Sequence, residues 1–131
     1  MQLKIPLSEV KQFLSNQFNI NIDLRNIDEN KIEVKYFDTL DLIIHDVKDN
    51  MFFFSYEVDG LANIASKVAH FFMKKKLDNT PIDWDLKNRE ITIDLNKFTE
   101  LTTFLQFVSI SKINFIKDSI VLELYQREKI Q

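Results

Sequence analysis

Apolar and polar residues alternate along four short stretches of the chain, and this pattern constrains the fold more than any other feature of the sequence. Residues 18–25 read FNINIDLR, so every second residue is apolar, and a similar alternation recurs at 31–37, 40–47 and 51–58. A repeat of two residues is that of a β-strand with one face buried and the other in water. Turn residues separate the stretches, and together they predict an antiparallel meander of four strands.

The remaining stretches predict three helices and two further strand pairs. Residues 5–18 place apolar side chains on one helical face, and we expect Ser8 to cap this helix. The longest helical pattern covers 61–77, with a broad apolar stripe at Leu61, Ile64, Ala65, Val68, Phe71 and Phe72. Strands at 80–86 and 90–95 then precede a short helix at 97–107, which Asn96 can cap, and a last strand pair within 108–115 and 119–125.

These elements predict the fold class. A one-sided sheet must cover its apolar face, and the helix at 61–77 is the expected cover. We therefore predict a single α+β domain over residues 1–131, in which a curved antiparallel β-sheet packs around one long helix, with two shorter helices. A helix followed by a hairpin occurs in both halves, which we interpret as coincidence rather than a repeat. The predicted core consists of Phe18, Ile20, Ile22, Val34, Leu42, Phe54, Tyr56, Ile64, Val68, Phe71, Trp84, Ile93, Leu101, Leu105 and Leu122.

The composition excludes several classes of site. The chain has one glycine, so the glycine-rich loops that bind phosphates and dinucleotides are excluded, and we expect no cofactor. It has no cysteine, which excludes disulfides, thiol catalysis and cysteine zinc sites. A net charge of −3 gives no electrostatic reason to bind nucleic acid.

The hydropathy pattern predicts that the chain does not cross a membrane. Its wholly apolar runs are no longer than about four residues, far below the ~20 that a spanning helix needs. The first ten residues lack the apolar core of a signal peptide. We therefore expect a cytoplasmic protein, or an exported one if a signal segment has been removed.

Polar residues offer two weak candidates for chemistry. His45 and His70 fall on predicted polar faces without a patterned partner, so we expect no catalytic residue. Asp83 and Asp85 point the same way on a strand, and Asp94 on the partner strand could join them around a divalent cation. We prefer the simpler interpretation that alternating aspartates face water, because the acidic loop spacing of calcium sites is missing. No metal site is predicted.

The order of elements in the C-terminal half resembles that of a known family. A long helix leads into PIDWDLKNREITIDL, then a short helix, then ISKINFIKDSIVLELY. This order resembles the ending of small bacterial domains of the tubular lipid-binding superfamily, where a curved antiparallel sheet wraps a long helix. The final hairpin there has the form I-x-F-x-x-D-x-I-x-L, matched here by Ile113, Phe115, Asp118, Ile120 and Leu122. The resemblance covers residues 60–125 best and implies lipid binding.

Two functional hypotheses follow, and an enzyme ranks behind both. The leading one is non-catalytic binding of an apolar ligand, such as a lipid or acyl chain, in a groove between the helix at 61–77 and the sheet. The simpler alternative for the groove is that its phenylalanines fill a dry core. The second hypothesis is a protein-interaction or structural module that uses exposed edge strands or an apolar patch, with no partner protein identified by the sequence.

The segment HFFMKKK, residues 70–76, raises the question of a ligand headgroup. At helical spacing, Lys75 and Lys76 fall inside the apolar sector of the predicted helix. The favoured interpretation is that these lysines end a core helix, where they meet its negative end and their stems cover apolar surface. Alternatively, they ring the mouth of the groove and hold an anionic headgroup. The predicted ligand-binding residues are Phe52, Phe54, Phe71, Phe72, Lys75 and Lys76.

Overall fold

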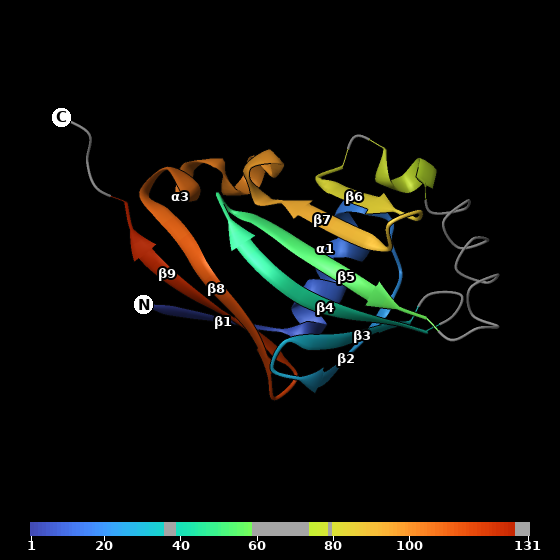
Figure 1. The fold of residues 1–131 in the computed structure, drawn as a ribbon. Coiled ribbons are helices and arrows are strands. Elements are labelled where there is room, and N and C mark those ends of the chain that lie inside the picture. The colour runs from blue at the N-terminus through green and yellow to red at the C-terminus, as the bar shows by residue number, and fades with distance from the viewer. Residues whose placement is uncertain (36–38, 59–73, 79, 128–131) are drawn as a thin grey trace.

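The computed structural model describes residues 1–35, 39–58, 74–78 and 80–127. Among them, residues 74–77 are helical, and the named elements follow in chain order (Figure 1). They are β1 (Gln2–Pro6), α1 (Leu7–Phe18), β2 (Asp23–Asp28), β3 (Lys31–Lys35), β4 (Thr39–Lys48), β5 (Met51–Glu57), β6 (Ile82–Asp85), β7 (Glu90–Asp94), the 3-10 turns η1 (Leu95–Lys97) and η2 (Thr99–Leu101), α3 (Thr102–Phe107), β8 (Val108–Ile116) and β9 (Ser119–Gln126). Within these described residues, no helix is long and apolar enough to cross a membrane.

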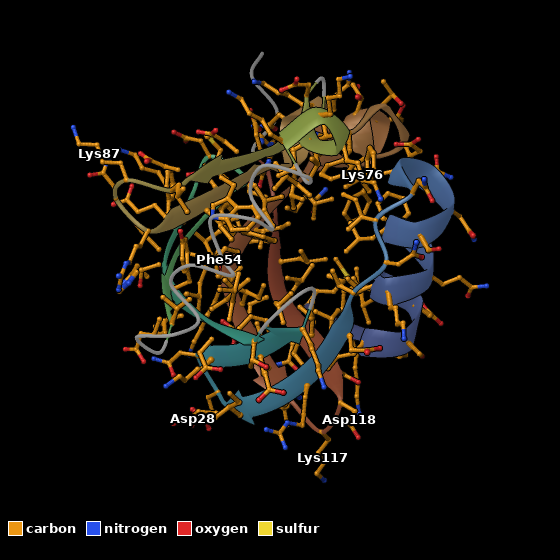
Figure 2. The ribbon with its side chains drawn as sticks, turned by 90° about the vertical axis from the view of Figure 1, so that its right-hand side faces the viewer. Asp28, Phe54, Lys76, Lys87, Lys117 and Asp118 are labelled. Carbon is orange, nitrogen blue, oxygen red and sulfur yellow. The ribbon has the colours of Figure 1, made fainter. Side chains whose placement is uncertain are left out.

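The described strands form two antiparallel sheets, which confirms the α+β class. The larger sheet has the order β2-β3-β4-β5-β7-β6, and the smaller has the order β1-β9-β8. Figure 2 shows the larger sheet curving around a central space, with α1 across its open side and the smaller sheet behind. We predicted one sheet around a long helix; the described residues instead divide their strands between two sheets, and α1 is the described helix that faces the space between them.

Two hairpins join the sheets at one end of the molecule. The backbone N–H of Phe115 in β8 donates to the carbonyl oxygen of Glu29, in the turn between β2 and β3, at 2.8 Å. The carboxamide of Asn26 lies against the turn between β8 and β9, and with its oxygen toward that turn it accepts from the N–H of Asp118 at 2.9 Å. Asp28, Lys117 and Asp118 mark this junction in Figure 2.

The N-terminal region differs from the prediction in three ways. Residues 2–6 form a strand that the sequence pattern did not predict, because β1 is stabilised by pairing with β9 at the far end of the chain. The first helix then starts at Leu7, so Ser8 does not cap it; Pro6 occupies the cap position without a side-chain bond. The helix ends at Phe18 as predicted, with left-handed Asn19 (φ 54°) after it, but residues 19–22 of the predicted strand at 18–25 are not in a strand, and β2 begins only at Asp23.

The helical predictions in the second half meet two different outcomes. The predicted helix at 61–77 lies outside the described residues except at 74–77, which are helical. The predicted helix at 97–107 is broken into η1, η2 and α3. Asn96 does not cap it: the Asp94 carboxylate accepts from the Asn96 N–H at 3.0 Å, while the Asn96 side chain donates to the carbonyl oxygen of Asp49 at 2.7 Å.

The predicted core is confirmed in part. Six of its described members are buried, namely Ile20, Leu42, Phe54, Tyr56, Leu105 and Leu122. The others are only half-buried, namely Phe18, Ile22, Val34, Trp84, Ile93 and Leu101. All of these half-buried residues except Phe18 line a cavity, which explains why their side chains retain free surface. Ile64, Val68 and Phe71 lie outside the described residues.

Candidate functional site: an apolar cavity between the sheets

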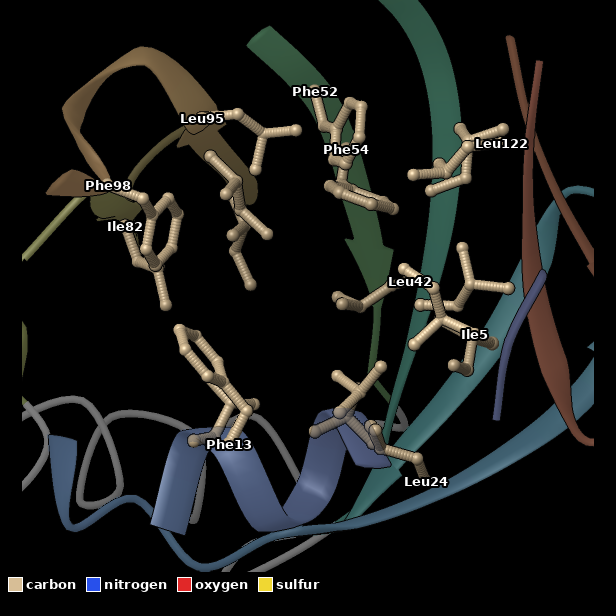
Figure 3. Close-up of a pocket in the computed structure, with 18 of the residues that line it drawn as sticks. Ile5, Phe13, Leu24, Leu42, Phe52, Phe54, Ile82, Leu95, Phe98 and Leu122 are labelled. Carbon is tan, nitrogen blue, oxygen red and sulfur yellow. The ribbon is translucent and has the colours of Figure 1, made fainter. Parts of the chain in front are cut away.

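A cavity of about 520 Å³ lies between the two sheets and α1. Every described strand contributes to its walls, as do α1, η1, η2 and α3. Its described lining is apolar except for two carboxylates, Glu9 and Glu100. Figure 3 shows apolar side chains from several elements pointing into this space, among them Phe13, Leu24, Phe52, Ile82 and Leu122.

Strand alternation places the aromatic wall. On β5, Phe52 and Phe54 share one face and are 7% and 6% exposed, whereas the intervening Phe53 points the other way and does not line the cavity. The Phe54 ring stacks on Phe115 of β8 with ring centroids 6.4 Å apart. This contact links the two sheets and fixes the wall of the cavity.

Helix α1 forms the facing wall through its apolar stripe. Val10, Phe13 and Leu14 line the cavity, at the three- and four-residue spacing of one helical face. Phe13, Phe18 and Phe98 form a cluster in which each pair of ring centroids is 5.8 Å apart. The cluster holds α1 against the segment between η1 and η2, so the helix stands over the cavity instead of filling it.

Only some of the predicted ligand-binding residues line the cavity. Phe52 and Phe54 both line the cavity, as expected for a ligand-facing pair. Phe71 and Phe72 lie outside the described residues. Lys75 is exposed, and the Lys76 Nζ donates to the carbonyl oxygen of Asn19 at 3.0 Å, just beyond the end of α1 (Figure 2). Neither lysine is among the described residues that line the cavity.

Some of the residues that line the cavity are also exposed at the surface. Only four of its described lining residues are exposed: Leu3 of β1, Glu9 of α1, Glu100 of η2 and Phe104 of α3. Leu3 and Phe104 are each 40% exposed. We call these four residues the rim. No ion pair joins either rim carboxylate to a cation within the described part of the chain.

A second cleft beside β6 holds two of the three aspartates considered as metal ligands. Asp83 and Asp94 line this cleft, together with Lys74 and Lys97. Asp85 instead accepts hydrogen bonds from the side chain and the backbone N–H of Asn88, at 2.8 and 3.1 Å, and these bonds lower the pKa of its carboxyl. Over residues 1–35, 39–58, 74–78 and 80–127, no group of three potential metal ligands comes together.

His45 has a partner that the sequence did not reveal. Its Nε2 contacts the hydroxyl of Ser55 across β4 and β5, on the exposed face of the sheet. The register shift between Ile44 and Asp46 brings the two side chains together, and no sequence signal predicts that shift. Among the described residues, no carboxylate is hydrogen-bonded to His45, and neither partner lines the cavity. His70 lies outside the described residues.

Comparison with protein-family models, curated proteins and solved structures gave no match. The cavity itself is therefore the basis for assigning a function. Three parts of its wall were not predicted from the sequence: β1, the α1 face and the rim. The spacing of Val10, Phe13 and Leu14 was a usable signal for the helix face, whereas the contribution of β1 depends on pairing across the whole chain.

Proposed function

We propose that this protein is a non-catalytic carrier or receptor that binds the apolar part of an amphiphilic ligand, such as a lipid or acyl chain, in the cavity between its sheets. The single observation that carries this proposal is the cavity of about 520 Å³ with almost entirely apolar described walls. This size lies within the ~300–1,000 Å³ range of small-molecule sites.

Energetics support an occupant. Apolar walls around an unfilled space of about 520 Å³ give up dispersion contacts, so an empty state is disfavoured. Water is a poor filling, because it needs two to four polar partners and these walls offer few. An apolar chain satisfies the same walls by dispersion contacts and burial alone.

The resemblance to tubular lipid-binding domains agrees with this proposal and remains a prediction. The helix at 61–77, which we expected to cover the apolar face of the sheet, also remains a prediction, because most of its residues lie outside the described part of the chain. Phe52 and Phe54 would contact the ligand chain from one wall, and Phe13 would contact it from α1.

The test has two parts. Organic extraction and native mass spectrometry of the purified protein should reveal a bound amphiphile. After delipidation, a titration with the neutral apolar dye Nile red should show saturable binding. A Leu42→Phe, Leu122→Phe double variant narrows the cavity and should weaken dye binding about tenfold, a loss of ~1.4 kcal/mol.

The matched control for binding is Leu124→Phe. Leu124 is buried to the same 6% exposure as Leu122 and lies two residues away on the same strand, but it does not line the cavity. This control should bind dye as the parent does, with folding checked by circular dichroism. A delipidated protein that binds neither dye nor amphiphile would show that the chain fills the space itself, and the proposal would then be wrong.

One observation favours a second candidate, a protein-interaction module. Phe107 and Tyr125 are 61% and 55% exposed at the end of the smaller sheet, and Phe107 is tied there by its carbonyl oxygen, which accepts from the Arg127 N–H at 2.9 Å. Large contiguous apolar patches mark contact surfaces, and these two rings would contribute to such a patch. Sedimentation at rising concentration would distinguish the candidates: ligand-free self-association that Phe107→Ser abolishes would favour the interaction module.

A further inference from the structure

Within the described residues, hydrogen bonds close the seam between the two sheets along β8, one edge strand of the smaller sheet. Near one end of β8, the Phe115 N–H donates to the carbonyl oxygen of Glu29 at 2.8 Å. Near the other end, the Ile110 N–H donates to the Oδ1 of Asn50 at 2.9 Å. The opposite edge strand, β1, forms no hydrogen bond to the larger sheet in this part of the chain. The seam beside β1 is therefore covered in another way.

Helix α1 covers the seam beside β1. It follows β1 directly in the chain and leads into β2, an edge strand of the larger sheet, so it passes from one sheet to the other (Figure 2). Its inner face, with Val10, Phe13 and Leu14, lines the cavity. Passage of a ligand between two paired strands would break backbone hydrogen bonds, which are costly to leave unmade. Passage beside α1 breaks no strand pairing.

Buried contacts hold the two ends of α1. At its start, Leu7 is 5% exposed and its N–H donates to the carbonyl oxygen of Asp118 at 2.8 Å. Just beyond its other end, Ile20 is 3% exposed, and the Lys76 Nζ donates to the carbonyl oxygen of Asn19 at 3.0 Å. Of the 12 residues in the helix, only Leu7 is buried. Segments with few buried side chains open at a lower free energy than core strands do.

Between these ends, α1 is held to its neighbours by contacts that we call the latch. They are the exposed ion pair of Lys11 with Asp23 and the ring contacts of Phe13 and Phe18 with Phe98. We infer that α1 is a lid, and that a ligand enters and leaves the cavity when the latch opens while both ends of the helix stay in place. This inference rests on the proposed function and adds how the site is opened.

A reversible cross-link tests the lid, because the chain has no cysteine of its own. In a Lys11→Cys, Asp23→Cys variant, a short bis-methanethiosulfonate reagent joins the two thiols, and a reducing agent releases them. Stopped-flow fluorescence follows Nile red entering the delipidated protein and leaving the loaded one. We expect the bridge to slow both rates on the order of tenfold, to change the equilibrium affinity by less than about twofold, and to be reversed by reduction.

The matched control is Arg25→Cys, Glu33→Cys. This ion pair also includes a residue of β2, but it joins β2 to β3, whose backbones are already paired at these two residues. Neither residue lines the cavity or contacts α1 through the latch. The same reagent should therefore change both dye rates by less than about twofold, since it restrains no moving part.

A second variant weakens the latch without changing the cavity wall. Phe18 contacts the rings of Phe13 and Phe98 but does not line the cavity. Phe18→Ala should speed the entry and release of dye about threefold to tenfold, the equivalent of one or two aromatic contacts. Its control is Phe53→Ala, which truncates another half-buried phenylalanine outside the cavity and should leave both rates unchanged. Circular dichroism checks the folding of both variants.

The outcomes separate the lid from the proposed function. If the bridge between residues 11 and 23 leaves both dye rates unchanged, the dye passes another part of the wall, and the lid is wrong while the cavity stands. Equal slowing by the control bridge would also overturn the lid, because α1 would then have no special part in the exchange. If the delipidated protein binds no dye with or without the bridge, the proposed function itself fails.

Discussion

Asn50 accepts hydrogen bonds from two segments that are distant in the sequence. It lies in the turn between β4 and β5 with φ 61°, a conformation that asparagine tolerates better than most residues, and it is only 1% exposed. Its Oδ1 accepts from the N–H of Ile110 in β8 at 2.9 Å, and its carbonyl oxygen accepts from the N–H of Leu95 at 3.0 Å. One side chain thus connects the larger sheet to the smaller sheet.

Asn50→Gly should therefore destabilise the protein. Glycine keeps the left-handed backbone, so the substitution removes the side-chain bond and leaves the Ile110 N–H without a partner, at a cost of about 1–3 kcal/mol. Chemical denaturation measures the loss, and hydrogen exchange should show the Ile110 amide deprotected. The matched control is Asp49→Gly, at the neighbouring exposed position with φ 53°, which should change stability by less than about 0.5 kcal/mol. Equal effects at both positions would mean that the bond to Ile110 contributes nothing.

At the scale of elements, α1 is held by an ion pair on one side and by rings on the other. The Lys11 ammonium bonds the carboxylate of Asp23 at the start of β2. This hydrogen bond and the charge of Lys11 lower the pKa of the Asp23 carboxyl, although the pair is exposed. Because the folded pKa is lowered, the contribution to stability is present above the unfolded value near ~4 and is lost as pH falls through the folded value.

Lys11→Met should raise the pKa of Asp23 toward its ordinary value. A carboxyl-carbon NMR titration follows the change residue by residue. Asp85 supplies an internal control, because the bonds from Asn88 that lower its pKa do not involve Lys11. An Asp23 titration that stays at its original midpoint in the variant would show that Lys11 does not hold this carboxylate in solution.

The aromatic cluster should couple α1 to the turn that follows η1. In a double-mutant cycle, Phe13→Leu and Phe98→Leu should show a coupling of about 0.5–1.5 kcal/mol, because their ring centroids are 5.8 Å apart. Denaturant unfolding of the four proteins measures it. Strict additivity would indicate that the contact between these two rings does not help to position α1.

At the scale of the whole molecule, the cavity changes the usual rule for core substitutions. Leu122 and Leu124 share a strand, a face and the same 6% exposure, but only Leu122 borders the cavity. A close-packed core resists added volume, and an unfilled one accepts it. Comparing the free energies of unfolding of Leu122→Phe and Leu124→Phe therefore tests whether the cavity is empty, independently of ligand binding.

Leu122→Phe should leave the melting temperature of the delipidated protein unchanged or higher. Leu124→Phe should overpack its surroundings and cost about 1–3 kcal/mol, or roughly 3–9 °C for a domain of this size. Differential scanning calorimetry compares the two. If Leu122→Phe is as destabilising as Leu124→Phe, the space between the sheets is already filled by protein atoms.

The sequence by itself determined most of the strands, but not β1, and which faces of those strands are apolar. The period of two residues at β3, β4 and β5 is a local property, and it alone is enough to place Phe52 and Phe54 together on the inner face. The tertiary structure decided how the strands divide into two sheets and what their apolar faces pack against. Pairing of β1 with β9 and the hydrogen bond from the Ile110 N–H to the Asn50 Oδ1 join residues far apart in the chain. Hydrophobic periodicity records that a side chain leaves water, but not whether it meets another side chain or an open cavity, so the rim and the cavity became visible only in the fold.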